Sequence, residues 1–348
     1  MPQSDVAGSS GRAVVDESQA GLAAAAPEPI DVVYTWVNGA DPAFQQRLQQ
    51  ALQAYPGPIL PTAASRQRFR DSGELRYSLR SLQAFVPWVR HVYLVTNGQV
   101  PPWLDTSSGR ISVVTHEAIF SDRSCLPTFN SNAIEMYLHR IPQLSQRFLY
   151  LNDDLFFGRP VRRSDFLPAS GGQCLYFVPV PVPNDPNAGL VHDRSFAYTF
   201  GLVERLWGPP RWRLLPAHVP QLYDRGILAY LESLLPSQFA ETSAHRFRSP
   251  DDLVLNILYA YYLLQSSEQA TQGHEVRLLQ YGSSEHSHVM LVDHPLVWRE
   301  LLRVRKNRPR FFAFNDDLGE VEDDHIVLRS MCLLLRCYFP RPSMFERR

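Results

Sequence analysis

The sequence has almost no lysine and almost no net charge, and both shortages narrow the kinds of partner it can bind. Lys306 is the single lysine among 34 basic residues, and the others are arginine. The 34 basic residues face 35 acidic ones, so the net charge is −1 and no overall basic field exists to attract nucleic acid. A phosphate-bearing partner therefore needs a local patch, for which the planar guanidinium group of arginine is well suited.

Signals for disulfides, zinc, export and membrane spans are also missing. The cysteines show no CxxC or Cys/His metal spacing, so we expect free thiols in a reducing compartment. The longest nearly apolar run, residues 253–264, is shorter than the roughly 20 residues that span a bilayer and predicts a buried helix. Residues 1–29 lack a secretory signal and predict a disordered leader. We expect a cytoplasmic protein, with or without peripheral attachment to the inner face of the cell membrane. The four cysteines are Cys125, Cys174, Cys332 and Cys337.

With 348 residues, 45% of them hydrophobic, the chain is long enough to form a core without disulfides. Leucine spacing after Ser72 and apolar spacing over residues 131–140 predict helices between the strands. Strands that alternate with helices, and are apolar on both faces, indicate a Rossmann-like α/β fold with a mostly parallel sheet flanked by helices. The β-branched and aromatic runs that predict these strands cover residues 30–37, 92–96, 111–115 and 148–151.

The second half of the chain is expected to add helices and a proline-rich loop. Residues 176–193 contain VPVPVPNDPNAG, whose prolines exclude a central strand. Residues 222–235 and 249–264 are expected to be helical, the second opening with a Ser-Pro N-cap. The expected organisation is a leader over 1–29, one α/β domain over 30–330 whose halves meet at residue 165, and a tail over 331–348.

Polar side chains follow each predicted strand, and parallel strands bring them to one edge of the sheet, where ligands bind in such folds. The pair Asp153 and Asp154 suits Mg²⁺ or Mn²⁺ bridged to diphosphate oxygens, although a solvated Asp turn is the alternative. Asp317, in a similar pair near the end of the chain, is a second candidate ligand. The groups that follow the strands are Asn38 with Gly39 and Asp41, Asn97 with Gly98, His116 with Glu117, and Asp153 with Asp154.

Basic and histidine residues complete the set of candidates. Arginines crowd the start of the helix predicted after Ser72, where free backbone N–H groups favour anions; a solvated charged face is the alternative. His218 lies between two prolines in LLPAHVPQ and could accept a proton at neutral pH, as could His116, although most histidines are structural or exposed. Arg246 and Arg248 lie together in SAHRFRSPDD. The crowded arginines are Arg66, Arg68, Arg70, Arg76 and Arg80.

These segments, in this order, resemble the four conserved blocks of the Stealth family. That family contains bacterial capsule-polysaccharide hexose-1-phosphate transferases and the catalytic α/β subunit of the Golgi N-acetylglucosamine-1-phosphotransferase. The resemblance covers most of residues 30–318. It is carried by DVVYTWVNGADP at 31–42, by the block from RFRDSGELRYSLRSL to FLYLNDDLFFG at 68–158, by PAHVPQLYDR at 216–225 with FRSPDDLVLN at 247–256, and by FNDDL at 314–318.

The resemblance implies a phosphotransferase with the fold of the nucleotide-sugar transferases, acting in capsule or exopolysaccharide synthesis. It would move hexose 1-phosphate, such as N-acetylhexosamine 1-phosphate, from a UDP-sugar to a hydroxyl of a polysaccharide acceptor, forming a phosphodiester and releasing UMP. The half over 30–165 would bind donor and metal, and the half over 166–330 would carry the base and phosphate-binding residues.

By motif position, the resemblance implies that Asp154 is the acidic residue at the metal and diphosphate site, that His218 is the general base and that Arg248 holds the phosphates. Asp153 and Asp317 would complete the metal site, which would hold Mg²⁺ or Mn²⁺. Further substrate contacts are expected from Asn38, Asp71, Arg76, Asn130, Arg246 and His116.

Two other functions remain compatible with the residues. A metal-dependent glycosyltransferase would use the same donor, but its acceptor attacks the sugar carbon and UDP is released. A silent binder of nucleotide sugars or polysaccharide would bind the donor without turnover. The Golgi subunit also carries inserted modules and membrane anchors, whereas this chain runs compactly between its blocks and so looks more like the bacterial members.

Overall fold

The computed structural model describes residues 27–347 except 58, 186, 188 and 267–269. All but the last three residues of the expected leader lie outside the described residues. Within the described part, no helix combines the length and apolar character that a bilayer span requires.

The centre of the molecule is a five-stranded sheet with the order β3-β2-β1-β4-β8. Its first four strands are parallel, with Val33 of β1 facing Tyr93 of β2 and Tyr150 of β4, and β8 pairs antiparallel with β4 at the edge. The mostly parallel sheet expected from the sequence is therefore confirmed. Its strands are β1 (Ile30–Thr35), β2 (Val92–Thr96), β3 (Ile111–Thr115), β4 (Arg147–Asn152) and β8 (Gln221–Asp224).

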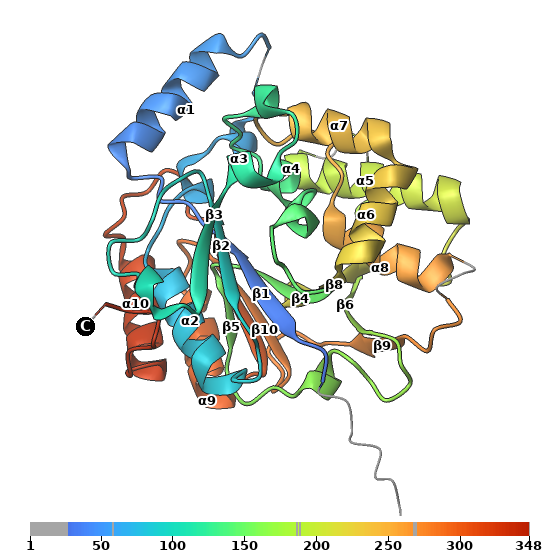
Figure 1. Cartoon of the computed structure of the whole chain (residues 1–348). Helices are drawn as coiled ribbons and strands as arrows, with labels where there is room; N and C mark the ends of the chain where they lie inside the picture. Colours follow the sequence, from blue (N-terminus) through green and yellow to red (C-terminus); the bar gives the residue numbers. More distant parts are fainter. Residues whose placement is uncertain (1–26, 58, 186, 188, 267–269, 348) are drawn as a thin grey trace, which may run out of the picture.

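Both faces of this sheet are buried, because successive side chains along each strand point to opposite sides. Val33 and Tyr150 face one core, which the helices α4 to α8 cover, whereas Tyr34 and Leu151 face the other core with α2. Figure 1 shows the first group of helices on one side of the sheet and α2 with α9 and α10 on the other. The helices of the first group are α4 (Ser131–Glu135), α5 (Val191–Trp207), α6 (Arg225–Leu234), α7 (Pro236–Ala244) and α8 (Leu255–Gln265).

A second, three-stranded sheet has the order β10-β11-β5. β5 follows β4 after the turn at Asp153 and Asp154, so this turn joins the two sheets. Its elements and covering helices are β5 (Leu155–Phe157), β10 (His286–Leu291), β11 (Phe311–Asp316), α2 (Glu74–Phe85), α9 (Leu296–Asn307) and α10 (Ile326–Tyr338). The remaining elements are α1 (Pro42–Ala54), α3 (His116–Ile119), β6 (Cys174–Pro181), β7 (Leu214–Pro216) and β9 (Glu275–Leu278).

The proline-rich segment is the clearest correction to the sequence prediction. β6 is the central strand of a third sheet with the order β7-β6-β9, although it contains Pro179 and Pro181. Its pairing with β9 ends at Phe177, and its pairing with β7 shifts register between Val178 and Pro181. The prolines are tolerated because they lie beyond the two-sided part of the strand, where no ladder hydrogen bond is required of them.

Three predicted helices are shorter than expected. The first three residues of the helix expected over 222–235 pair with β4 as part of β8, and Asp224 then caps α6 by accepting from the backbone of Gly226. The helix expected from Ser249 begins at Leu255, because the buried Asp252 side chain accepts the backbone N–H of Ser249 and holds a turn there. The helix expected over 131–140 is α4 followed by a 3₁₀ turn.

The expected boundary at residue 330 falls inside α10. Beyond it, Phe345 is 4% exposed within the core around α2, and the backbone N–H of Arg347 donates to the carbonyl of Trp103. Residues 331–347 are therefore part of the folded domain, because they close its core.

Candidate active site

The strand ends meet at one edge of the central sheet, as the sequence predicts. The backbone N–H of Asn38, after β1, donates to Gln99 Oε1 (2.9 Å), and Gln99 Nε2 donates back to the Asn38 carbonyl. Gly39 donates its N–H to the carbonyl of Phe69 (2.7 Å), and a Cβ at position 39 would lie 2.4 Å from that oxygen. Only glycine allows this approach, which brings the segment before α2 against the end of β1.

A cluster of carboxylates lies at this edge, where the turn after β4 meets the start of α2. Burial raises the pKa of Asp153 well above its usual value, and the charges of Asp154, Glu74 and Asp71 raise it further. Burial also raises the pKa of Asp71, and burial with the Asp71 charge raises that of Glu74 to about 8. Carboxyl groups that suppress one another's ionisation in this way form a site of excess negative potential.

His218 completes this cluster from the loop before β8. Its Nε2 lies 3.5 Å from Asp154 Oδ1. Burial lowers the pKa of His218, but the charges of Asp154 and Glu135 outweigh burial and raise the pKa above its usual value. The predicted meeting of the β4 turn and the His218 loop is thus present in the structure.

Glu135 of α4 lies near both Arg248 and His218, because the charges of both act on its carboxyl group. Burial raises the pKa of Glu135 to about 7, while the positive charges of Arg248 and His218 both lower it. Arg248 Nη2 donates to Ser131 Oγ (2.7 Å) at the start of α4, and burial lowers the pKa of the guanidinium group. His218 thus lies next to Asp154, and His218 and Arg248 both act on Glu135, although these residues come from distant parts of the chain.

A divalent cation fits beside Asp154. Asp154 Oδ1 is buried, and no described residue donates a well-aligned hydrogen bond to it; its charged neighbour is His218 Nε2 at 3.5 Å, so the oxygen is available to a cation. Asp317 is exposed, accepts Gln67 Nε2 (3.2 Å) and acts with its charge on Arg68, and its place in the metal set stays a prediction from the sequence. Within the described ranges, no three His, Cys, Asp or Glu residues are arranged to hold an ion by themselves.

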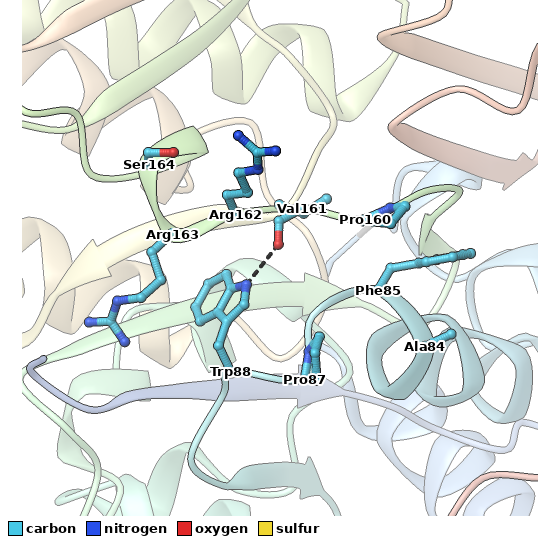
Figure 2. A pocket seen from close by; sticks show the side chains of 9 residues that line it. All are labelled: Ala84, Phe85, Pro87, Trp88, Pro160, Val161, Arg162, Arg163 and Ser164. Atoms are coloured by element: carbon cyan, nitrogen blue, oxygen red, sulfur yellow. Dashed lines mark hydrogen bonds between the residues drawn. The ribbon is translucent and has the colours of Figure 1, made fainter.

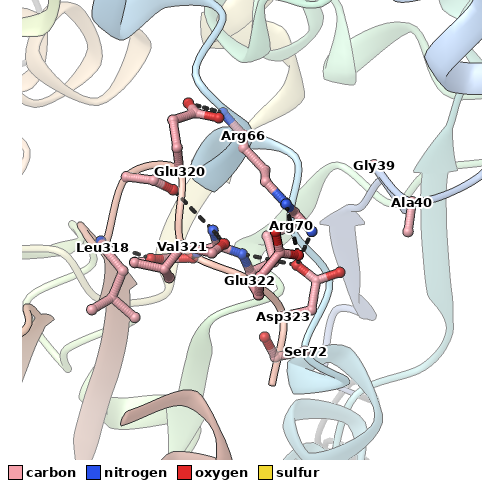
Figure 3. Close-up of polar contacts among 12 residues, drawn as sticks. Gly39, Ala40, Arg66, Arg70, Ser72, Leu318, Glu320, Val321, Glu322 and Asp323 are labelled. Atoms are coloured by element: carbon pink, nitrogen blue, oxygen red, sulfur yellow. Dashed lines mark hydrogen bonds and ion pairs between the residues drawn. The ribbon is translucent and has the colours of Figure 1, made fainter. Parts of the chain in front are cut away.

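Four of the five crowded arginines bind protein carboxylates, which corrects the prediction of an arginine-rich diphosphate site. Figure 3 shows Arg66 and Arg70 reaching into the acidic loop after β11. Arg66 pairs with Glu322 and Asp323, and Arg70, whose side chain is 1% exposed, pairs with Asp316 and Asp323. Arg80 and Arg76 both pair with Glu346, at 2.7 Å and 3.7 Å. Arg68, the fifth, donates to the carbonyl of Thr62 and lies close enough to Arg248 for the two charges to act on each other.

The other predicted contacts take structural positions. Asn130 is fully buried, where its Nδ2 donates to Asp252 (2.8 Å) and its Oδ1 caps α4, so it holds the Arg248 loop rather than a ligand. Arg246 donates to the carbonyls of Pro127 and Ser124. The Asn38 side chain accepts from the backbone of Ala40.

His116 occupies a different part of the same edge. It lines a cavity of about 310 Å³ beyond β2 and β3 together with Asn97, Glu117 and Phe129. Burial lowers its pKa to about 4, so the imidazole is neutral at physiological pH. A larger, open hollow of about 630 Å³ lies at the opposite ends of the strands, where the indole N–H of Trp88 donates to the Val161 carbonyl (Figure 2).

Sequence reasoning missed several residues that the fold brings to the site. Glu74 and Glu135 lie inside the blocks quoted for the resemblance, and the Asp-x-x-Glu spacing of Asp71 and Glu74 at a predicted helix start was an available signal. His192 and His288 lie outside those blocks and had no local signal. The His288 ring lies 5.1 Å from the ring of His218.

Comparison with known proteins gives close relatives in sequence. An exopolysaccharide phosphotransferase of Streptomyces coelicolor is 39% identical over 334 residues, which cover 92% of this chain and 53% of the relative. Exopolysaccharide phosphotransferase CpsY of Mycobacterium tuberculosis is 34% identical over 332 residues, or 91% of this chain and 58% of the relative. The chain thus spans about half the length of these curated relatives.

Solved structures with a similar course of the chain are glycosyltransferases of low sequence identity. The galactosyltransferase LgtC, in complex with donor and acceptor sugar analogues, superimposes with a TM-score of 0.43 at 10% identity and covers 88% of this chain and 96% of its own. Mouse xyloside xylosyltransferase 1 superimposes with a TM-score of 0.36 at 11% identity, covering 82% of this chain and 98% of its own.

The family regions coincide with the segments that build the site. Residues 28–56 match conserved region 1 of the Stealth proteins, residues 68–175 match conserved region 2, and residues 217–265 match conserved region 3. Asp154 lies in the second of these regions, and His218 and Arg248 lie in the third. The chain therefore belongs to the Stealth family.

Proposed function

We propose that this protein transfers a sugar 1-phosphate from a UDP-sugar to a hydroxyl group of a polysaccharide acceptor. The observation that carries the proposal is the approach of His218 to within 3.5 Å of Asp154, with Glu135 near both His218 and Arg248. Phosphoryl transfer requires a proton acceptor, acidic residues and a positively charged side chain around one phosphate. His218, the carboxylate cluster with Asp154 and the guanidinium group of Arg248 are groups of these three kinds. The names of the relatives, exopolysaccharide phosphotransferases, support the same reaction.

The proposed reaction is a displacement at phosphorus. The acceptor oxygen forms a bond to the phosphorus atom that carries the sugar, and the bond from that phosphorus to the oxygen of UMP breaks. His218 takes the proton of the attacking hydroxyl, and UMP leaves with the electron pair. An imidazole whose pKa is raised is a stronger proton acceptor once it is neutral, which suits a poorly acidic sugar hydroxyl.

Arg248 would stabilise the negative charge that develops on the phosphate oxygens. Its burial removes competing water, and Ser131 fixes one of its nitrogen atoms, so the guanidinium group is held in place before the substrate binds. The donor is expected to be a UDP-N-acetylhexosamine, as the family resemblance implies.

Asp154 and Asp153 would hold a Mg²⁺ or Mn²⁺ ion. Such an ion would supply positive charge next to the diphosphate. The protein's own contribution is the cluster with Asp71 and Glu74, whose mutual repulsion keeps the site attractive to a cation. Such repulsion destabilises the free protein and is relieved when a cation binds.

The identity of the released nucleotide tests the proposal. The protein is incubated with several UDP-sugars and a polysaccharide primer, and UMP and UDP are separated while ³¹P spectra are searched for a diester. We expect UMP and a diester. Release of UDP would instead identify a glycosyltransferase, and donor binding without either nucleotide would identify a silent binder.

A substitution at His218 tests the role of this residue. His218→Gln keeps the size and polarity of the side chain but cannot take the proton, so we expect UMP release to fall by about 10²–10⁴-fold. The matched control is His91→Gln, which changes a histidine near the opposite ends of the strands that contacts Ser112. Near wild-type turnover by a folded His218→Gln protein would contradict the assignment.

A further inference from the structure

Arg68 and Arg248 differ from the neighbouring arginines in their partners. Among the described residues, neither has a carboxylate oxygen within 4.0 Å of its guanidinium nitrogens. Arg68 donates to the carbonyl of Thr62, and Arg248 donates to the hydroxyl of Ser131. Both side chains are largely covered by protein. The charges of Glu135 and Asp252 act on Arg248, and that of Asp317 acts on Arg68, but none of these carboxylates forms an ion pair with either arginine. A covered cation without a paired anion is costly, and a bound anion offsets that cost.

An aromatic cluster holds these two arginines near each other. Phe69 follows Arg68 directly, and Phe247 precedes Arg248. Both rings pack on Phe129, with ring centroids 6.3 Å from Phe69 and 5.5 Å from Phe247.

Backbone contacts strengthen the same junction. The N–H of Phe129 donates to the carbonyl of Arg246 (2.7 Å), which connects the segment before α4 to the loop that contains Arg248. Gly39 ties Phe69 to the end of β1. The three family regions therefore converge on one aromatic cluster that carries an arginine on each of two sides.

The two guanidinium groups act on each other and on a histidine. Burial and, to a smaller degree, the nearby charge of Arg248 lower the pKa of Arg68 to about 9, although the charge of Asp317 opposes them. His192, the second residue of the 17-residue helix α5, has a lowered pKa because of burial, and both arginines contribute to the lowering. The first turn of α5 adds the partial positive charge of a helix N-terminus.

We propose that Arg68 and Arg248 together bind the diphosphate of the nucleotide-sugar donor, so that Arg68 is a substrate-binding residue of this enzyme. The inference deepens the proposed function and rests on it for the identity of the donor. Two guanidinium groups on opposite sides of a diphosphate can donate hydrogen bonds to oxygens of both phosphates. Together they neutralise more of the negative charge of the diphosphate than one arginine does. Arg66, two residues away, serves the fold instead by pairing with the acidic loop after β11.

The test compares Arg68→Gln with the matched control Arg66→Gln. Thermal unfolding of the full chain is followed in chelator, without divalent cations, while inorganic pyrophosphate, UDP or uridine is added. We expect pyrophosphate and UDP, but not uridine, to stabilise the wild type and Arg66→Gln. For Arg68→Gln, the ligand concentration needed to give the same rise in melting temperature should increase at least tenfold.

A second readout separates binding from folding. Because Arg68→Gln removes one of two like charges, its melting temperature without ligand should equal or exceed that of the wild type. Arg68→Lys keeps the positive charge but loses the planar guanidinium group that donates two parallel hydrogen bonds. Its response to pyrophosphate should therefore lie between those of the wild type and Arg68→Gln. An unchanged pyrophosphate response in folded Arg68→Gln would overturn the inference.

The outcome also separates this inference from the proposed function. If pyrophosphate binding depends on Arg68 while the enzyme releases UDP rather than UMP, the phosphotransfer proposal fails and the diphosphate site stands. If UMP is released and Arg68→Gln changes neither the KM for the donor nor the pyrophosphate response, the site assignment fails and phosphotransfer stands.

Discussion

Two turns with the same sequence follow two different strands, and the fold uses them differently. The Asn-Asp-Asp turn after β4 leads to a carboxylate cluster beside His218, whereas the Asn-Asp-Asp turn after β11 places Asp316 on the buried Arg70 and leaves Asp317 exposed. Both are strand-end turns, as the sequence predicts. What separates them is the partner: a carboxylate next to other carboxylates favours a cation, and a carboxylate next to a buried arginine stabilises the fold.

The largest expected difference between the turns is in activity. Asp154→Asn should lower UMP release by about 10³-fold, because it removes a carboxylate that would hold the cation next to the transferred phosphate. Asp317→Asn should stay within threefold of the wild type, because its exposed side chain contacts Gln67. Initial rates of UMP release measure both. Equal losses for the two variants would show that the second turn also belongs to the active site.

For stability, by contrast, we expect the turn at the end of β11 to be the one that matters. Asp316→Ala leaves Arg70, whose side chain is 1% exposed, without its closest partner, and should lower the free energy of unfolding by about 3 kcal/mol. The matched control, Glu322→Ala, removes a carboxylate that is 78% exposed and should change stability by less than about 0.5 kcal/mol. Urea unfolding at pH 7 gives both values. An Asp316→Ala protein as stable as the control would show that Arg70 is satisfied by its backbone partners alone.

Acid should weaken both sheets through two buried histidines. Burial lowers the pKa of His116, at the end of β3, and of His286, on β10 beside β11, to about 4 in each case. An unfolded histidine takes up its proton near pH 6.5, so stability is complete above this pH and falls as the pH drops toward 4. Each should cost roughly 1.4 kcal/mol at pH 5.5.

Variants separate the two histidines in this pH experiment. His116→Asn and His286→Asn should each lose part of the pH dependence between 6.5 and 5, measured by urea unfolding at a series of pH values. If the slope is the same in the wild type and in both variants, the acid sensitivity lies elsewhere, for example in the ion pairs of the surface.

The smallest expected effect is the stabilisation of the protein by a cation bound at the turn after β4, which contains Asp154. Mg²⁺ or Mn²⁺ at ten times its dissociation constant should add about 1.4 kcal/mol to the free energy of unfolding. Chelator should remove this increment. Asp154→Asn should abolish it and Asp317→Asn should preserve it. A cation response that survives in Asp154→Asn would place the ion at another part of the protein.

Part of the fold and part of the site could be predicted from the sequence. The strands at residues 30, 92, 111 and 148 were predictable, because each is a short apolar run that ends at a turn signal. So was the meeting of Asp154 and His218 at one edge, through the rule for parallel sheets and the family resemblance. The crowding of arginines at the start of α2 predicted that they bind anions together, but the structure divides them: Arg66 and Arg70 pair with the acidic loop, and Arg76 and Arg80 pair with Glu346.

The divided roles were not predictable because they depend on residues distant in the chain. Arg66 and Arg70 meet carboxylates about 250 positions away, and no local pattern reports such a contact. Asn130 was expected to touch substrate because its block matches a family, but its amide is engaged by Asp252, 122 residues further on. The helix expected from Ser249 begins only at Leu255 because Asp252, three residues after Ser249, accepts its backbone N–H, and the carboxylate that does so is itself held by the distant Asn130.

By itself, the sequence determined the kind of fold, the family and the chemical types gathered near the strand ends, because apolar periodicity and turn residues act over a few positions. Only the tertiary structure decided which charges neutralise one another and which are left for a ligand. Charge pairing depends on distances of a few ångströms between segments that the chain does not place side by side, so it is decided when the sheets and helices pack.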